Sequence, residues 1–285
     1  MVRARADLHT HSVCSDGSDS PAVLVRKAEK MGLGGIALTD HDTLKGLRDF
    51  MDAASRANLT GVPGVEISTE HDGKEVHLLG YYVPFDSEEL LRRLESLSNA
   101  RQVRFLKMVE KLRGIGIDVR QEEVDEVLQG VESPGRPHLA GLLVRKGVVR
   151  NSAEAFRHYL VEGKPAYVKK ERLGTVEAIR LLRSAGAVPV IAHPLTIETA
   201  NLREFLEHLQ KYGAVGVETE YDYASWGTAG SPEDVRKAVQ GLGFIETGGS
   251  DYHGDKAAAR LGSATVEIGT IEKLKQATRI ILSEG

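Results

Sequence analysis

The chain has 285 residues, of which 41% are hydrophobic and 27% are charged, and its net charge is −4. These values are ordinary for a globular protein and argue against a strongly basic nucleic-acid coat protein. Cys14 is the single cysteine, which excludes a disulfide framework, and we expect its thiol to pack rather than to act as a ligand or nucleophile. The opening residues MVRARADLH lack the apolar run of a signal peptide, and no stretch is long enough to span a bilayer, so we expect a cytoplasmic protein without membrane contact.

The first part of the chain alternates between short strand patterns and amphipathic helix patterns. Residues 20–32 predict a helix, because Ser20 can cap it, Pro21 suits its first turn and Gly32 can close it. Strands are expected at 34–42, 62–68 and 74–83, and a second helix at 44–58. Such alternation is typical of βαβ units around a parallel sheet or barrel.

The alternation stops over residues 86–170, where the pattern is helical and residues 90–116 predict one long helix. This stretch holds 16 Lys and Arg against 13 Asp and Glu, a net charge of +3, whereas the remaining residues sum to −7. Helices are then expected near 175–186, at 201–212 and at 232–240, and strands at 187–193, 214–220 and 243–251. We therefore predict a barrel in two parts, 1–85 and 171–285, interrupted by a helical insertion at 86–170.

Residue types that bind metals lie in or just after most of the predicted strands. Parallel α/β folds bring the carboxyl ends of their strands to one face, where residues from distant segments meet. His9 and His11 project to the same side of an extended chain, and His77 alone would more often be a core residue. The candidate ligands are His9, His11, Asp16, His41, Glu66, His77, His193, Asp251 and His253.

Imidazoles combined with bridging carboxylates suit Mn, Fe or Zn, whereas Ca or Mg sites use oxygen ligands. The set is too large for one four-coordinate ion, so we expect two or three divalent metal ions, with Mn favoured over Fe and Zn. Multinuclear sites of this kind activate water and stabilise in-line displacement at phosphorus. The residues thus predict a hydrolase of phosphate esters.

The motifs DLHTHSVCSDG, LTDHD, GVEIS, HLLGY, AHP and GSDYHG occur in this order along the chain. Through them the chain resembles the polymerase and histidinol phosphatase (PHP) superfamily. The resemblance implies an α/β fold, a distorted seven-stranded (β/α) barrel of PHP type with a trinuclear metal site and a helical insertion domain. It places the first metal on His9, His11, Glu66 and Asp251, a second on the bridging Glu66 with His77 and His193, and the third on Asp16, His41 and His253.

Within the superfamily, the insertion containing SPGRPHLAGLLVRKG resembles that of bacterial enzymes that remove the 3′-phosphate of nucleoside 3′,5′-bisphosphates, such as pAp to AMP. Relatives of that group also act as 5′→3′ exonucleases on short RNA. Arg101 and Arg104 are three residues apart on one helical face, and guanidinium groups suit phosphate. The resemblance implies that the residues that bind substrate phosphate are Arg101, Arg104, Arg136 and His138.

The predicted reaction is metal-dependent phosphomonoester hydrolysis, in which a hydroxide held by the metals attacks phosphorus. Asp16, His41 or His253 would assist proton movement to the leaving oxygen, and the sequence does not choose among them. The expected substrate is a small nucleotide or short oligoribonucleotide, without a stable nucleic-acid complex or a protein partner. The alternatives are a 5′→3′ exonuclease or phosphodiesterase on short oligoribonucleotides, then a histidinol-phosphate phosphatase, and last a metal-binding module without turnover.

The chain departs from many relatives after the predicted strand 214–220. Those relatives continue with a Tyr-His stretch, whereas this chain reads TEYDYASWGT. Contacts made by that loop in relatives therefore cannot be transferred. Tyr221, Tyr223 and Trp226 either stack on a nucleobase or pack in the core.

Overall fold

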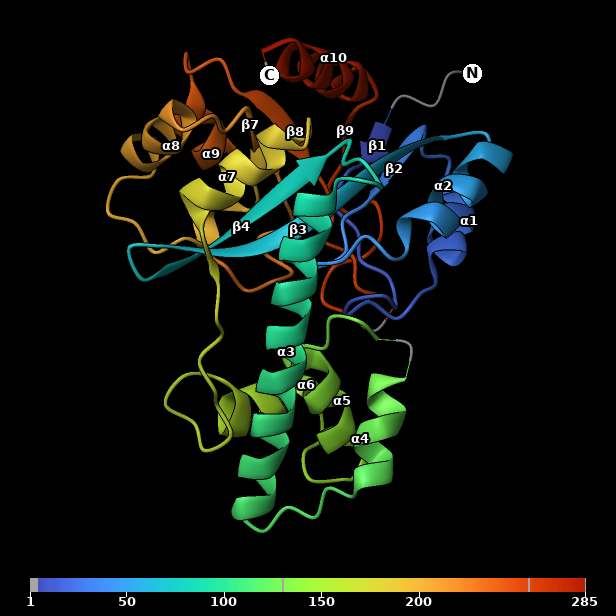
Figure 1. Ribbon diagram of the computed structural model, residues 1–285, viewed down its shortest axis with the longest axis vertical. Helices are drawn as coiled ribbons and strands as arrows, with labels where there is room; N and C mark the ends of the chain where they lie inside the picture. The colour runs from blue at the N-terminus through green and yellow to red at the C-terminus, as the bar shows by residue number, and fades with distance from the viewer. Residues whose placement is uncertain (1–4, 130, 256, 285) are drawn as a thin grey trace.

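The computed structural model describes residues 5–129, 131–255 and 257–284, with the barrel above and a helical segment below in the view of Figure 1. The strands are β1 (Arg5–Asp7), β2 (Gly35–Leu38), β3 (Thr60–His71), β4 (Lys74–Tyr81), β5 (Leu173–Gly174), β6 (Val188–Ile191), β7 (Gly216–Glu220), β8 (Ile245–Gly248) and β9 (Val266–Glu267). The helices are α1 (Pro21–Met31), α2 (Leu47–Arg56), α3 (Glu88–Gly114), α4 (Gln121–Leu128), α5 (Arg136–Arg145), α6 (Ser152–Ala155), α7 (Thr175–Ser184), α8 (Leu202–Lys211), α9 (Pro232–Val239) and α10 (Gly269–Glu284). Two short turns of helix complete the set, η1 (Phe156–Leu160) and η2 (Pro194–Thr196).

Helix α1 forms as its sequence predicts. The Ser20 hydroxyl accepts a hydrogen bond from the Val23 N–H at 3.4 Å, and Pro21 opens the helix. Gly32 ends it with φ 81°, a left-handed conformation that glycine adopts without steric cost. Leu24 and Ala28 on its inner side are fully buried in the barrel core.

The strands follow one path, β8-β7-β6-β4-β3-β2-β1-β9, with β5 paired to β3. Strand β8, at one end of this path, and the residues that follow it adjoin the segment after β1, because the Leu8 N–H donates to Gly248 O at 3.1 Å and the His11 N–H donates to Tyr252 O at 2.9 Å. The sheet is therefore a nearly closed barrel. The seven longer strands correspond to the seven expected, while β5 and β9, of two residues each, were not predicted.

Strand β4 corrects the expectation of a parallel sheet, because it runs antiparallel to both neighbours, β3 and β6. Asp72 and Gly73 connect β3 to β4 with φ of 50° and 79°, a tight hairpin turn that leaves no room for a crossover helix. The start of β4 consequently lies near the carboxyl end of β3, where His77 pairs with Ser68. This reversal explains why a ligand candidate early in its strand reaches the same face as residues that follow theirs.

Helix α3 connects the barrel to the helical segment (Figure 1). Its first turns place Leu90 and Leu94 in the barrel core. Its later turns place Phe105 and Met108 in a separate apolar core shared with α5. The helix runs from Glu88 to Gly114, close to the predicted 90–116, and the expected domain boundaries at 86 and 170 stay predictions.

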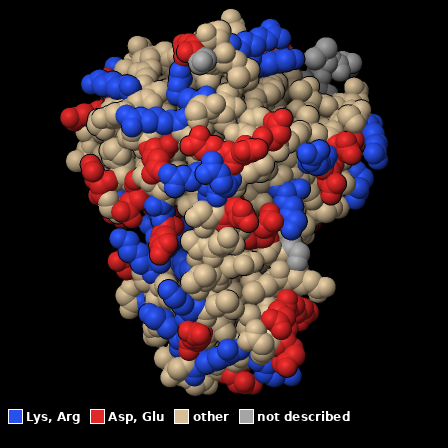
Figure 2. Space-filling view, viewed as in Figure 1, with Lys and Arg blue, Asp and Glu red and all other residues tan. Residues whose placement is uncertain are grey.

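Charge is unevenly distributed over the helical segment. Figure 2 shows acidic side chains gathered over α4, whose sequence QEEVDEVL holds four of them. Basic side chains lie mainly on the other side of the segment in this view. The net charge of +3 expected for the insertion is thus a poor description of any one of its surfaces, and the position of individual arginines matters more.

The carboxyl-terminal helix α10 was not predicted from the sequence. It buries Ile271 and Leu274 against Ala6 and Leu8 of the first strand region. Among the described residues, none of the helices combines the length and the apolar character that crossing a membrane requires. Residues 1–4 of the opening segment lie outside the described residues, and the expected cytoplasmic location stays a prediction.

Candidate metal centre

Glu66 lies at the centre of the proposed ligand set. Its side chain extends from β3 and is 1% exposed. Its Oε2 atom is 3.4 Å from His9 Nε2, 3.2 Å from His11 Nε2 and 3.1 Å from His41 Nδ1. Its Oε1 atom is 2.9 Å from His77 Nδ1 and 3.2 Å from His193 Nε2. The two oxygens therefore face different imidazoles, as a bridging carboxylate requires.

The charge of the central carboxylates follows from their surroundings. Burial alone would raise the pKa of Glu66, but the nearby His41, His77 and His9 hold its pKa well below the usual range. Burial would likewise raise the pKa of Asp16, but His253 and His41 hold it well below the usual range. Both side chains are thus carboxylates, the form that binds cations.

Ligand-type atoms converge in three groups, within each of which they lie no more than 4.8 Å apart. The groups are His9, His11, Glu66 and Asp251; His41, Glu66 and His77; and His11, Asp16, His41 and His253. The first group is the set that the resemblance implies for the first metal. In the second, His41 stands where His193 was expected, and in the third, His11 joins the expected residues. Among the described residues, His193 alone of the nine candidates lies outside these groups.

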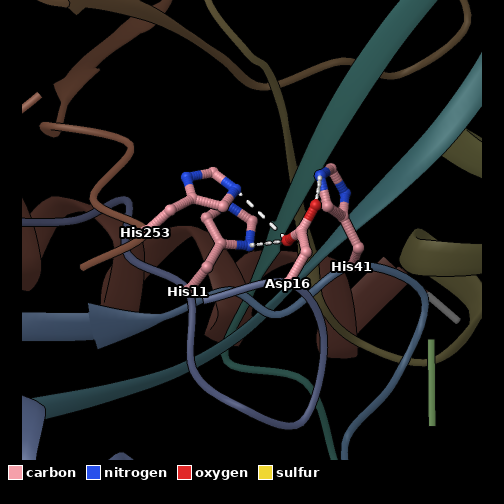
Figure 3. Close-up of side chains that lie close together, drawn as sticks. All are labelled: His11, Asp16, His41 and His253. Carbon is pink, nitrogen blue, oxygen red and sulfur yellow. Dashed lines mark ion pairs between the residues drawn. The ribbon is translucent and has the colours of Figure 1, made fainter. Parts of the chain in front are cut away.

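Figure 3 shows the group around Asp16, whose carboxylate lies between His41 and the pair His11 and His253. Its Oδ1 atom is 3.2 Å from His253 Nε2 and 3.9 Å from His11 Nδ1. Its Oδ2 atom is 3.9 Å from His41 Nε2. These side chains come from the loop after β1, the end of β2 and the loop after β8, so the closure of the barrel brings them together.

The loop that carries Asp16 is held by a buried carboxylate. Asp40 accepts hydrogen bonds from the Ser12 N–H at 2.7 Å, the Ser12 hydroxyl at 2.6 Å and the Ser15 hydroxyl at 2.6 Å. Cys14 within this loop is half-buried, belongs to none of the three groups, and has a thiol pKa raised mainly by burial. Its packing agrees with the expectation of an inert thiol.

The hydrogen bonding of the centre tests whether these residues fit metal ions. Within the described residues, six buried ligand-type atoms have no hydrogen-bond partner: His9 Nε2, His11 Nδ1, His11 Nε2, Asp16 Oδ1, His41 Nδ1 and Asp251 Oδ1. Each buried polar atom left unpaired costs about 1–3 kcal/mol, so a fold seldom gathers several in one place. Divalent cations would satisfy all of them, and the mixture of imidazole and carboxylate is the donor set of a multinuclear transition-metal site.

The four residues expected to bind substrate phosphate lie in three different surroundings. Arg101 is buried and already donates to Asp42 Oδ2 at 2.6 Å and to the Ser68 hydroxyl at 2.9 Å. Arg104 and Arg136 line one pocket of about 350 Å³. His138 lines another, of about 440 Å³, together with Asp16.

The sequence did not point to several residues that border the centre. Lys170 is buried 3.8 Å from Asp42, and mainly because of burial its pKa falls to about 7. Arg172, two residues on, pairs with Glu75 beside His77. Both lie in the basic run KKER, residues 169–172, which could have indicated a cationic wall.

The loop after β7 also takes a definite form. Tyr221 and Tyr223 are buried and pack in the core, one of the two outcomes expected for them. Trp226 is 36% exposed, and its ring centre lies 5.7 Å from that of His253. Trp226 alone of the three therefore offers an accessible aromatic face beside the centre.

Imidazoles and carboxylates grouped at the carboxyl ends of barrel strands, with unpaired atoms directed at common points, define a metal-dependent hydrolase. Comparison with known proteins gives the particular family. The model of the PHP domain matches residues 7–158, more than half of the chain. The chain belongs to the PHP domain family.

Relatives of known name agree with this assignment. A 5′-3′ exoribonuclease of Haemophilus influenzae is 34% identical over 74% of this chain and 77% of its own length. A 3′,5′-nucleoside bisphosphate phosphatase of Chromobacterium violaceum is 30% identical over 99% of this chain and 96% of its own. A Bifidobacterium adolescentis protein predicted to be a metal-dependent phosphoesterase superposes with a TM-score of 0.86 at 27% identity, over 95% of this chain and 96% of that one. The protein is thus a metal-dependent phosphoesterase.

Proposed function

We propose that this enzyme removes the 3′-phosphate from nucleoside 3′,5′-bisphosphates, for example converting pAp to AMP. The observation that supports this substrate is the pocket lined by Arg104 and Arg136. Thr196 lines the same pocket, and its hydroxyl lies 2.9 Å from Nδ1 of His193. The pocket thus borders the candidate ligand His193, and we assign it to the second phosphate of the substrate.

Arg104 and Arg136 form no ion pair within the described part of the chain, whereas the third arginine that lines this pocket, Arg172, pairs with Glu75. Arg104 donates to the Val168 carbonyl at 2.7 Å, and Arg136 lies over the Phe156 ring at 5.6 Å. Burial first, and then Arg136 and Arg101, lower the pKa of Arg104 to about 10. A bound phosphate would relieve this repulsion between cations, and guanidinium groups bind phosphate with two hydrogen bonds.

We assign the hydrolysis reaction to residues of the barrel. The nine candidate ligands would hold two or three divalent ions, with Mn favoured over Fe and Zn, and these ions when bound lower the pKa of water and neutralise charge on the phosphoryl oxygens. Asp16, His41 and His253 surround one point and are the proposed groups for proton movement to the leaving 3′ oxygen. Arg104 and Arg136 hold the 5′-phosphate, which fixes the 3′-phosphate at the centre.

The substrate proposal is tested by removing one phosphate from the substrate. We expect kcat/KM for adenosine 3′,5′-bisphosphate to exceed that for adenosine 3′-monophosphate by about ten- to a hundredfold, because a charge-assisted contact contributes about 1.5–3 kcal/mol. Steady-state phosphate release on the two compounds measures the ratio. Equal efficiencies would contradict a role for the second phosphate.

The metal proposal is tested by elemental analysis of protein purified without chelator. Eight of the nine candidate ligands converge in three groups, which predict two or three equivalents of Mn, Fe or Zn per chain. A stoichiometry at or below one, even after reconstitution with Mn²⁺, would contradict a multinuclear centre.

A 5′→3′ exonuclease acting on short oligoribonucleotides is the second candidate. In addition to the Haemophilus influenzae relative, it is favoured by a pocket of about 600 Å³ between α3 and the loop after β2, lined by Arg48, Phe85 and Asn99. This pocket is large enough for a further nucleoside. Both reactions break the bond between phosphorus and the 3′ oxygen, so the two candidates differ only in whether the phosphate carries a second nucleoside. Turnover of the dinucleotide pApA, compared with that of pAp, separates them.

A further inference from the structure

Strand β7 carries none of the nine proposed ligands, yet its end adjoins three of them. We propose that Glu218, supported by Tyr221, is a positioning residue that orients the metal ligands. Glu218 is 0% exposed, and in the described part of the chain no lysine or arginine pairs with it. A buried carboxylate without a cationic partner is unfavourable unless other donors compensate it. The donors here come from His9 and His193.

The first contact of Glu218 orients the His9 ring. Glu218 Oε1 lies 3.0 Å from His9 Nδ1. A neutral imidazole has one N–H, so donation from Nδ1 leaves the lone pair on Nε2. Nε2 lies 3.4 Å from Glu66 Oε2 and 3.3 Å from Asp251 Oδ1 and is the nitrogen directed at the centre. Glu218 therefore selects the tautomer of His9 that can bind a metal.

The second contact of Glu218 holds the backbone of His193. Glu218 Oε2 accepts a hydrogen bond from the His193 N–H at 2.8 Å. His193 has φ 25° and ψ 61°, a backbone conformation that residues with a side chain seldom adopt. This conformation directs His193 Nε2 to within 3.2 Å of Glu66 Oε1. The acceptor on Glu218 thus stabilises a strained residue that the centre needs.

Tyr221 extends the same function to a third ligand. Its hydroxyl donates to Asp251 Oδ2 at 2.9 Å. The other oxygen, Oδ1, faces His9 at 3.3 Å and His11 at 3.1 Å. Strand β7 and the residue that follows it, which are not proposed ligands, therefore fix the orientation of ligands from three other parts of the barrel. This arrangement organises the centre before metal binds, which lowers the cost of binding.

Glu218→Gln tests the proposal, with Glu220→Gln as the matched control. Glu220 lies on the same strand but pairs with Arg236 away from the centre. A glutamine amide can accept only one of the two hydrogen bonds and presents an N–H to the other donor. We expect Glu218→Gln to weaken the affinity of chelator-treated protein for Mn²⁺ by about ten- to a hundredfold in calorimetric titration. The control should bind Mn²⁺ as the unchanged protein does.

The melting temperature of the metal-free protein separates positioning from a purely structural role. If Glu218 acts on the ligands, the stabilisation by added Mn²⁺ shrinks, whereas a purely structural role lowers the metal-free Tm and leaves that stabilisation unchanged. Unchanged Mn²⁺ affinity in Glu218→Gln, with or without a lower Tm, would overturn the proposal.

A second variant tests the proposal if Glu218→Gln does not fold. Tyr221→Phe removes one hydroxyl and should weaken Mn²⁺ binding by about three- to tenfold. If Glu218→Gln does not fold and Tyr221→Phe binds Mn²⁺ normally, the proposal is overturned. The inference rests on the ligand set of the proposed function, but it is measured without substrate. If the bisphosphate assignment fails, Mn²⁺ binding is unaffected, so that failure can be distinguished from a failure of the present proposal.

Discussion

The barrel and the helical segment contribute side chains of different character to the same cleft. Six of the nine candidate ligands of the barrel are buried, and five of the histidines lie within 3.4 Å of Glu66. Arg104 and Arg136 of the helical segment are only partly buried, and Arg136 has a ring as its neighbour rather than a carboxylate. Under the proposed function, the barrel residues carry out the reaction and the arginines select the substrate. Changes in the barrel should affect every substrate, whereas changes in the helical segment should affect only substrates that reach it.

The largest effect is expected from the barrel. Glu66→Gln withdraws negative charge from the point shared by five imidazoles, and we expect kcat/KM to fall by about 10³-fold, or roughly 4 kcal/mol, on both pAp and an aryl phosphate. Phosphate release and circular dichroism measure activity and fold. Glu246→Gln, an exposed position on β8, is the control. A loss of activity on pAp alone would contradict the expectation that changes in the barrel affect every substrate.

An intermediate and selective effect is expected from the helical segment. Arg136→Ala should lower kcat/KM for pAp by about ten- to a hundredfold and leave an aryl phosphate nearly unchanged, because only the bisphosphate reaches the arginine pocket. Arg150→Ala, at an exposed arginine paired with Glu154 on the same segment, is the matched control. Equal losses on both substrates would mean that Arg136 supports the fold or the metal centre.

A smaller effect should locate the nucleobase. Trp226→Ala should raise KM for pAp about fivefold, or ~1 kcal/mol, the low end for stacking of a base on an aromatic ring. The KM for an aryl phosphate of similar reactivity serves as the internal comparison. Tyr212→Ala removes an exposed aromatic ring elsewhere and should change neither constant. An unchanged KM in Trp226→Ala would exclude the ring from the binding site.

Local signals in the sequence were sufficient for much of the fold. The helix over Pro21–Met31 was predictable because its cap, its proline and its closing glycine act within a few residues. The direction of β4 was missed, although the pair Asp72 and Gly73 between two strand patterns is typical of a two-residue hairpin and so indicates antiparallel strands. Helix α10 was also missed, although its buried residues Ile271, Leu274, Ala277 and Ile281 recur at helical spacing.

The candidate site likewise contains residues that the sequence could identify and residues that it could not. The nine proposed ligands could be named because histidines and carboxylates recur in or just after strand patterns and because their motifs resemble the PHP superfamily, although His77 alone would more often be a core residue. Glu218 could not, since a glutamate within GVETE has no pattern that separates it from a surface residue of an edge strand. Its role depends on its distance from His9, 209 positions away in the chain, which no local signal encodes.

The length and packing of helix α3 restrict motion between the barrel and the helical segment. Its 27 residues span roughly 40 Å without a break, and its two ends belong to different apolar cores. Hinge motions usually use loops or the ends of elements, so bending the two regions toward each other would require deforming this helix. The spacing between the arginine pocket and the metal centre should therefore stay constant through turnover. If the proposed function holds, the enzyme selects substrates by the fixed distance between their two phosphates and does not close around them.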